Sequence, residues 1–218
     1  MINSNARKLT LSGWLRKNNP REYDSPLKLQ KFLLFYELLT KTAGEQADFD
    51  HLRGYKRGPV FSNVWGDYTK ERTSFNEAVD EAYSNNADIV KDARARKSAF
   101  IVSVLSEHEL SALSHELNLW NSKRDRIMDN EYQVTLDEAD FNGDDAKMVS
   151  LLDSMYPDNL VASTKVLSID QYSFVFSLHD YAKLKESDID ILSSLTETGE
   201  LHNPTYVEIE EDGRLVID

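Results

Sequence analysis

The feature that most constrains the fold is the segment Leu27–Leu39, with the sequence LKLQKFLLFYELL. Beyond its first turn, this segment is apolar on almost every side of a helix, and such a helix belongs at the centre of a bundle. Ser25 and Pro26 precede it and favour a helix start, because a serine hydroxyl caps free backbone N–H groups and proline needs no N–H at the first position. The sequence therefore predicts a mainly α-helical bundle around this segment.

About six helices are expected in the bundle. One of them should begin at Gly58-Pro59, with Pro59 at its first helical position. The motifs Ser74–Glu77 and Ser106–Glu109 have the S-x-x-E pattern of a capping box and should open two more. The remaining helices are expected over residues 6–17, 27–39 and 89–105.

The chain changes character after residue 130. Residues 132–136 alternate like a strand, 173–177 resemble a buried strand, and 146–155 and 188–195 should be helical. Near the end, Asp212-Gly213 stands between two alternating apolar runs, which is typical of a β-hairpin. We therefore expect a helical domain over 1–130 and a smaller α/β extension over 131–218 that ends in a hairpin.

Charge follows the same division. Of the 25 Lys and Arg and 38 Asp and Glu, residues 131–218 hold 5 and 20, which gives that part a net charge of −15. Residues 1–130 hold the other 20 and 18, a net charge of +2. An acidic surface attracts basic proteins and repels phosphate backbones, so direct nucleic-acid binding is not expected. The alternative interpretation is a solvated face that serves only solubility.

The sequence suggests no chemistry of its own. It has no Cys, its five His do not form an H-E-x-x-H motif, and no phosphate-binding glycine loop or G-x-S-x-G elbow is present. The turn Asp140–Asp145 departs from the calcium-loop pattern. We therefore expect no catalytic residue, cofactor or metal. The N-terminus lacks the apolar core of a signal peptide, so a cytoplasmic protein without a membrane association is expected.

Three stretches in order, residues 26–39, 52–65 and 110–120, together resemble the Panacea domain, also called the SocA-like antitoxin domain, of bacterial and phage toxin–antitoxin modules. The resemblance covers roughly residues 8–125. Leu119 replaces the proline that usually precedes the final Trp of the motif, and residues 131–218 lie outside the usual domain. The matching residues, which we expect to be mainly structural, include Lys28, Gln30, Lys31, Tyr55, Gly58, Pro59, Val60, His115 and Trp120.

The resemblance implies an antitoxin that binds and neutralises a cognate protein toxin, with a protease as a further partner if the protein acts as an adaptor. An acidic antitoxin suits a basic toxin. The alternative from another class is a phage or prophage inhibitor of a host defence protein that acts as an acidic nucleic-acid mimic; an enzyme with an unseen site is a third. We hypothesise that the extension meets the partner through Phe174 or Tyr206 as anchor and the carboxylates of Glu208, Glu210, Glu211 and Asp212.

Overall fold

The computed structural model describes residues 1–199 and 201–218, and these are mostly helical. The helices are α1 (Ala6–Asn18), α2 (Pro20–Asp24), α3 (Pro26–Thr42), α4 (Ser62–Lys70), α5 (Arg72–Asn86), α6 (Asp92–Val104), α7 (Glu107–Glu116), α8 (Asn118–Asn121), α9 (Arg124–Met128), α10 (Gly143–Met155), α11 (Asp158–Ser163), α12 (Leu178–Lys183) and α13 (Glu186–Thr198). The strands are β1 (Leu52–Tyr55), β2 (Gly58–Phe61), β3 (Val134–Thr135), β4 (Thr164–Ile169), β5 (Tyr172–Ser177), β6 (Thr205–Ile209) and β7 (Leu215–Ile217).

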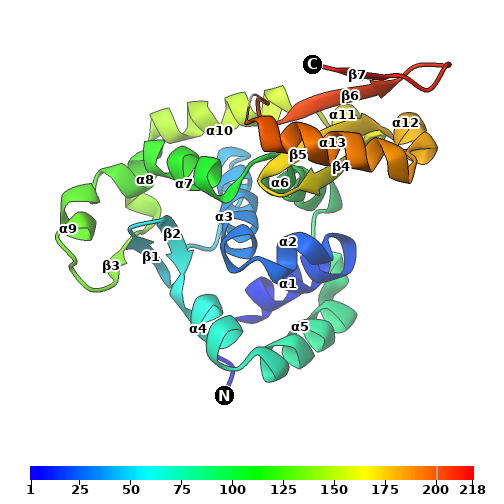
Figure 1. Ribbon diagram of the computed structural model, residues 1–218. Helices are drawn as coiled ribbons and strands as arrows, with labels where there is room; N and C mark the ends of the chain where they lie inside the picture. Colours follow the sequence, from blue (N-terminus) through cyan, green and yellow to red (C-terminus); the bar gives the residue numbers. More distant parts are fainter. Residues whose placement is uncertain (200) are drawn as a thin grey trace.

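Helix α3 runs through the middle of the helical part, as its apolar sequence predicts (Figure 1). Thirteen of its 17 residues are buried, and α1, α6 and α10 pack against it. The Ser25 hydroxyl accepts a hydrogen bond from the backbone N–H of Lys28 at 3.2 Å, and Pro26 is the first helical residue. The predicted start and the central position of this helix are confirmed.

The predicted number of about six helices is wrong: the described residues contain thirteen. Five of them (α2, α8, α9, α11 and α12) have only four to six residues, because several segments expected to be loops form a single helical turn. The Ser106–Glu109 capping box is confirmed, with both of its hydrogen bonds present. The Ser74–Glu77 box is not a helix start, because α5 already begins at Arg72.

Pro59 does not start a helix. It lies in β2, which pairs with β1 as an antiparallel hairpin in which Pro59 faces Gly54. The sheet order β2-β1-β3 makes β2 an edge strand, where the missing N–H of a proline is tolerated. Helix α4 begins only at Ser62, and Gly58, with φ = 103°, ends the tight turn between the strands.

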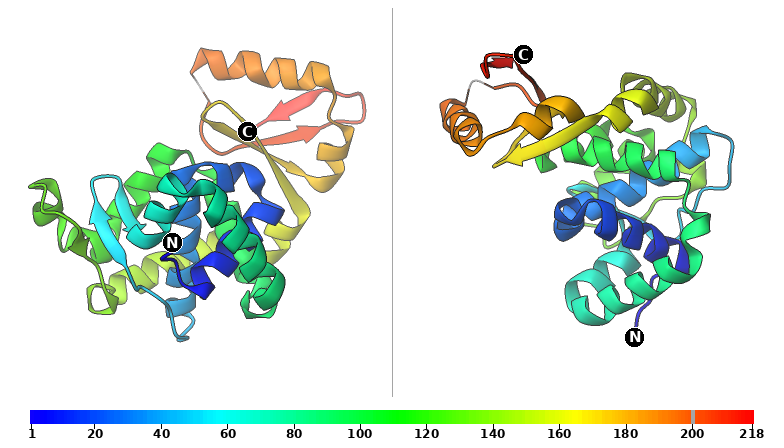
Figure 2. Two further views of the ribbon diagram at one scale, coloured as in Figure 1. Left: turned by 90° about the horizontal axis from the view of Figure 1, so that it is seen from below. Right: turned by 90° about the vertical axis from the view of Figure 1, so that its right-hand side faces the viewer.

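The C-terminal strands form a second sheet in the order β4-β5-β6-β7, in which β5 and β6 are parallel and the other neighbours antiparallel. The predicted terminal hairpin is confirmed as β6–β7, with Gly213 at φ = 87° in its turn. This sheet, together with α12 and α13, projects from one side of the helical part (Figure 2). None of the described helices is both long and apolar enough to cross a membrane.

The described residues form two hydrophobic cores, and the boundary between these cores does not coincide with the change in net charge at residue 130. The smaller core draws only on residues from 167 onward, with Phe174, Phe176 and Leu192 at its centre. Val149 of α10 and Tyr156, which lie beyond the predicted boundary at 130, belong to the larger helical core. Residues 131–161 are therefore an acidic part of the helical body, and the projecting α/β unit begins near β4.

Candidate functional site

The motif residues of α3 attach this central helix to its neighbours. The Lys31 ammonium donates a hydrogen bond to the Ser114 hydroxyl of α7 at 2.8 Å, and the Gln30 side-chain oxygen accepts one from the Phe61 N–H of β2 at 2.8 Å. A Cβ atom on Gly58 would clash with both Lys31 Nζ and Ser114 Oγ. Two of the predicted motif residues, Gln30 and Lys31, therefore make buried hydrogen bonds to neighbouring elements. Because Gly58 has no side chain, the backbone of the β1–β2 hairpin can lie close to Lys31 and Ser114.

The motif residues of the third stretch hold the other side of the same hairpin. Trp120 of α8 is buried, and its indole N–H donates to the carbonyl oxygen of Tyr55 at 3.0 Å, as expected for a Trp that closes the core. The His115 ring stacks on Trp120, with 4.0 Å between ring centroids. Burial lowers the pKa of His115, and the Lys31 charge lowers it further. The three stretches thus meet at one junction of α3, β1–β2 and α7–α8.

Lys31 is an unusual residue in this junction. Its side chain is 1% exposed, and no carboxylate of the described residues forms an ion pair with it. Burial, and the nearby Arg57 guanidinium, lower its pKa from 10.5 to about 7. Ser114 and, at 3.5 Å, the Pro59 carbonyl are the acceptors of its ammonium. Burial makes the charged form of Lys31 energetically costly. The Lys31 ammonium lies directly against the backbone of Gly58, so the two motif residues are in contact.

Two hollows lie on either side of the β1–β2 turn, and both are lined by Lys56, Arg57 and Glu107. The first, of about 720 Å³, lies between this turn, α2, α7 and the β4–β5 turn. It includes the motif residues Lys28 and His115. We call it the basic hollow, because Arg21, Lys28, Lys56 and Arg57 line it against two carboxylates, Glu107 and Asp170.

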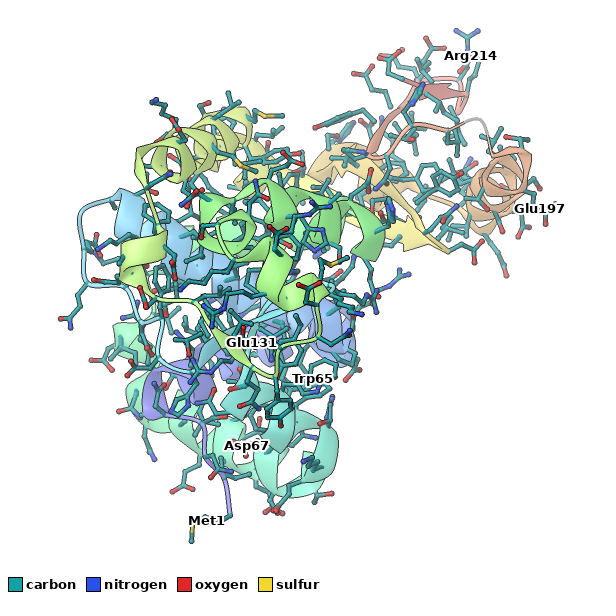
Figure 3. All side chains as sticks on the ribbon, turned by 90° about the vertical axis from the view of Figure 1, so that its left-hand side faces the viewer. Met1, Trp65, Asp67, Glu131, Glu197 and Arg214 are labelled. Atoms are coloured by element: carbon teal, nitrogen blue, oxygen red, sulfur yellow. The ribbon has the colours of Figure 1, made fainter. Side chains whose placement is uncertain are left out.

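The second hollow, of about 540 Å³, is more apolar. Trp65 and Tyr132 border it and are 40% and 83% exposed. Figure 3 shows Trp65 beside Glu131 on this face of the molecule. Trp65 lies on α4, which begins at Ser62 after the β1–β2 hairpin that the sequence did not predict, and the buried residues of this helix are Val64, Asp67 and Tyr68.

Apart from Phe174, the predicted partner-binding residues lie on β6 and in the β6–β7 turn of the projecting unit. Strand β6 alternates, so that Thr205, Val207 and Ile209 are buried while Tyr206 and Glu208 are exposed. Glu210 is also exposed and pairs with Arg214 at 2.6 Å. Figure 3 shows Arg214 at the tip of this unit. We call Tyr206, Glu208, Glu210, Glu211 and Asp212 the acidic hairpin face.

Phe174 does not belong to this face. It has no exposed surface and lies at the centre of the smaller core. In the sheet it pairs with Thr205, whereas Tyr206 pairs with Val175, whose side chain packs in the helical core. Paired residues share a side of a sheet, so Phe174 and Tyr206 point to opposite sides. Tyr206, which is 40% exposed, is therefore the only one of the two that can contact a partner directly.

The described residues contain no group of three or more His, Cys, Asp and Glu side chains that could hold a metal ion. Searches for similar proteins found no matching family model, curated protein or solved structure. The resemblance to the Panacea domain therefore rests on the three motifs, and the junction described above is the structural context in which those motifs occur.

Proposed function

We propose that this protein is an antitoxin that neutralises a basic protein toxin by direct binding, and that the acidic hairpin face contacts the toxin. The observation that carries the proposal is the arrangement of β6. It places the exposed Tyr206 two residues before the exposed Glu208, and in the described residues neither the Glu208 nor the Glu211 carboxylate makes a hydrogen bond or an ion pair. Free carboxylates beside an exposed aromatic ring suit a basic partner.

The roles within this face follow from burial and pairing. Exposed carboxylates mainly steer an oppositely charged partner, so Glu208 and Glu211 should raise the association rate. Tyr206 offers an aromatic surface with a polar end, which is the kind of residue that anchors interfaces. Glu210 is held by Arg214, and Asp212 accepts the Arg214 N–H at 3.0 Å, so both also maintain the turn.

The junction of the three motif stretches is consistent with separate structural and partner-binding parts of the protein. Gln30, Lys31 and Trp120 are buried and bonded within the helical part, where they hold its shape. Such residues suit a common scaffold, while the projecting unit supplies the variable surface. A family whose members bind unrelated toxins requires this combination of a constant core and an added recognition element.

A growth experiment tests the proposal. The product of the reading frame next to this gene is expressed from an inducible promoter, alone and together with this protein. We expect growth arrest alone and recovery on co-expression. A variant that combines Glu208→Gln, Glu211→Gln and Tyr206→Ala should recover growth poorly. If the neighbour is not toxic, or if the variant protects as well as the parent, the proposed function or the proposed face is wrong.

A matched control tests whether the loss of protection comes from the acidic hairpin face itself or only from the smaller negative charge of the variant. Asp190 and Glu197 are exposed on α13, in the same projecting unit, and Figure 3 shows Glu197 away from the hairpin tip. The double variant Asp190→Asn, Glu197→Gln removes two charges as well, and it should protect like the parent. Competition by DNA for the partner would instead favour the nucleic-acid mimic.

A further inference from the structure

The basic hollow is lined by more cations than carboxylates, although the chain as a whole is acidic. The whole chain carries a net charge of −13, yet Arg21, Lys28, Lys56 and Arg57 line this hollow against only Glu107 and Asp170. Glu107 is already engaged, since one oxygen pairs with Arg57 at 2.9 Å and the other accepts from the Ser25 hydroxyl at 2.7 Å. Positive charge thus remains around Lys28 and Lys56.

Lys28 is the most informative of these residues. Its ammonium forms no hydrogen bond or ion pair with any described residue, although burial lowers its pKa. The Glu22 charge acts against that lowering without forming an ion pair, and the Arg21 charge adds to it. Lys28 also lies in the first turn of α3, where the helix dipole disfavours a cation. Burial, the Arg21 charge and the helix dipole therefore all act against the Lys28 ammonium. The charges of Glu22, Glu107 and Glu109 offset part of this cost, but none of these carboxylates forms an ion pair with it.

The hollow is lined by parts of the chain that are distant in sequence. Lys28 and His115 come from two of the motif stretches, and Ser168 and Asp170 come from the β4–β5 turn of the projecting unit. The Arg21 guanidinium donates to the Ser168 carbonyl oxygen, which joins α2 to that turn. Figure 1 shows the β4–β5 end of the sheet above α2. The cations are thus held around one space by the fold.

We infer that the basic hollow binds a small multivalent oxyanion, a phosphate ester or a polycarboxylate, with Lys28 as the central contact and Lys56 beside it. A dianion would supply the negatively charged partner that the Lys28 ammonium lacks. A lysine ammonium binds such groups as a point charge. A volume of about 720 Å³ accommodates a small organic molecule. The site is separate from the acidic hairpin face, so it does not depend on the proposed function.

Calorimetric titration of the full-length protein with pyrophosphate and with citrate, at matched ionic strength, tests the inference. We expect saturable binding of at least one anion with one site, and the preferred anion distinguishes a phosphate ester from a polycarboxylate. Lys28→Gln should weaken that binding by about tenfold or more, and Lys28→Arg should retain most of it. The matched control is Lys70→Gln, which removes an exposed lysine on α4 and should bind like the parent.

Thermal melts without and with the anion give a second readout. Lys28→Gln removes an unpaired and partly desolvated charge, so its midpoint should equal or exceed that of the parent, while the stabilisation by the anion should be lost. Lys56→Gln, at an exposed position, repeats the binding test without risk to the core. Absence of saturation with both anions, or equal binding by the parent, Lys28→Gln and Lys56→Gln, would overturn the inference.

Discussion

The ammonium of Lys31 in α3 lies 2.8 Å from the hydroxyl of Ser114 in α7, and the backbone of Gly58 passes directly over this pair. This contact joins residues from all three motif stretches. It explains why a lysine, a glycine and the L-S-x-L-S segment around Ser114 occur together in the sequence: the turn can approach the pair only if residue 58 has no side chain.

Gly58→Val should therefore destabilise the protein strongly. A side chain here is strained at φ = 103° and meets Lys31 and Ser114, so we expect a loss of about 2 kcal/mol or more in the free energy of unfolding. Gly66→Ala is the control, because a Cβ there has no neighbour within 4 Å. Circular-dichroism melts of both variants provide the measurement, and an unchanged midpoint for Gly58→Val would refute the prediction.

Trp120 should contribute through both packing and its indole N–H. Trp120→Ala is expected to cost about 3–5 kcal/mol, because it opens a cavity beneath the hairpin. Trp120→Phe keeps much of the ring but leaves the Tyr55 carbonyl without its donor, so it should cost less, about 1–3 kcal/mol. Denaturant unfolding gives both values. Equal losses for the two variants would mean that the ring packing contributes little.

Lys31 should make stability depend on pH in the alkaline range. Its pKa is about 7 in the folded protein against 10.5 ordinarily, so the unfolded chain holds more protons between these values. Stability should therefore rise with pH from about 7 to about 10, by roughly 1 kcal/mol per pH unit from this residue. Below pH 7 the cost of the buried charge is fully present. Lys31→Met should remove this part of the slope in denaturant titrations at pH 7 and 9.

The purified protein should contain no stoichiometric zinc or calcium. Elemental analysis measures this directly, and the melting midpoint should be the same with and without EDTA. A fall of several degrees with EDTA would show that the histidines or the Asp140–Asp145 turn hold a metal.

The sequence predicted those elements whose signals are local. The central helix, the Ser106–Glu109 box and the terminal hairpin each depend on neighbouring residues, and each is confirmed. The helix start predicted at Pro59 was wrong, because a proline after a glycine fits the start of a helix as well as an edge strand. Only the pairing with β1, a contact formed by the folded chain, decides between them.

The sites were less predictable for the same reason. Phe174 and Tyr206 both lie on strands, yet no sequence pattern shows that their side chains point to opposite sides of one sheet. The basic hollow combines Lys28, His115 and Asp170, which are far apart along the chain. Charge composition showed where acidity accumulates, but it could not show which lysines are left without a partner.

Binding kinetics with the proposed toxin at two ionic strengths test the proposed role of the acidic hairpin face most directly. The parent should associate quickly at low salt and more slowly at high salt, because exposed charges steer the encounter. Neutralising Glu208, Glu210, Glu211 and Asp212 together should slow association and flatten this salt dependence, whereas Tyr206→Ala should mainly speed dissociation. If the four-residue variant keeps the association rate and salt dependence of the parent, the acidic hairpin face does not bind the toxin.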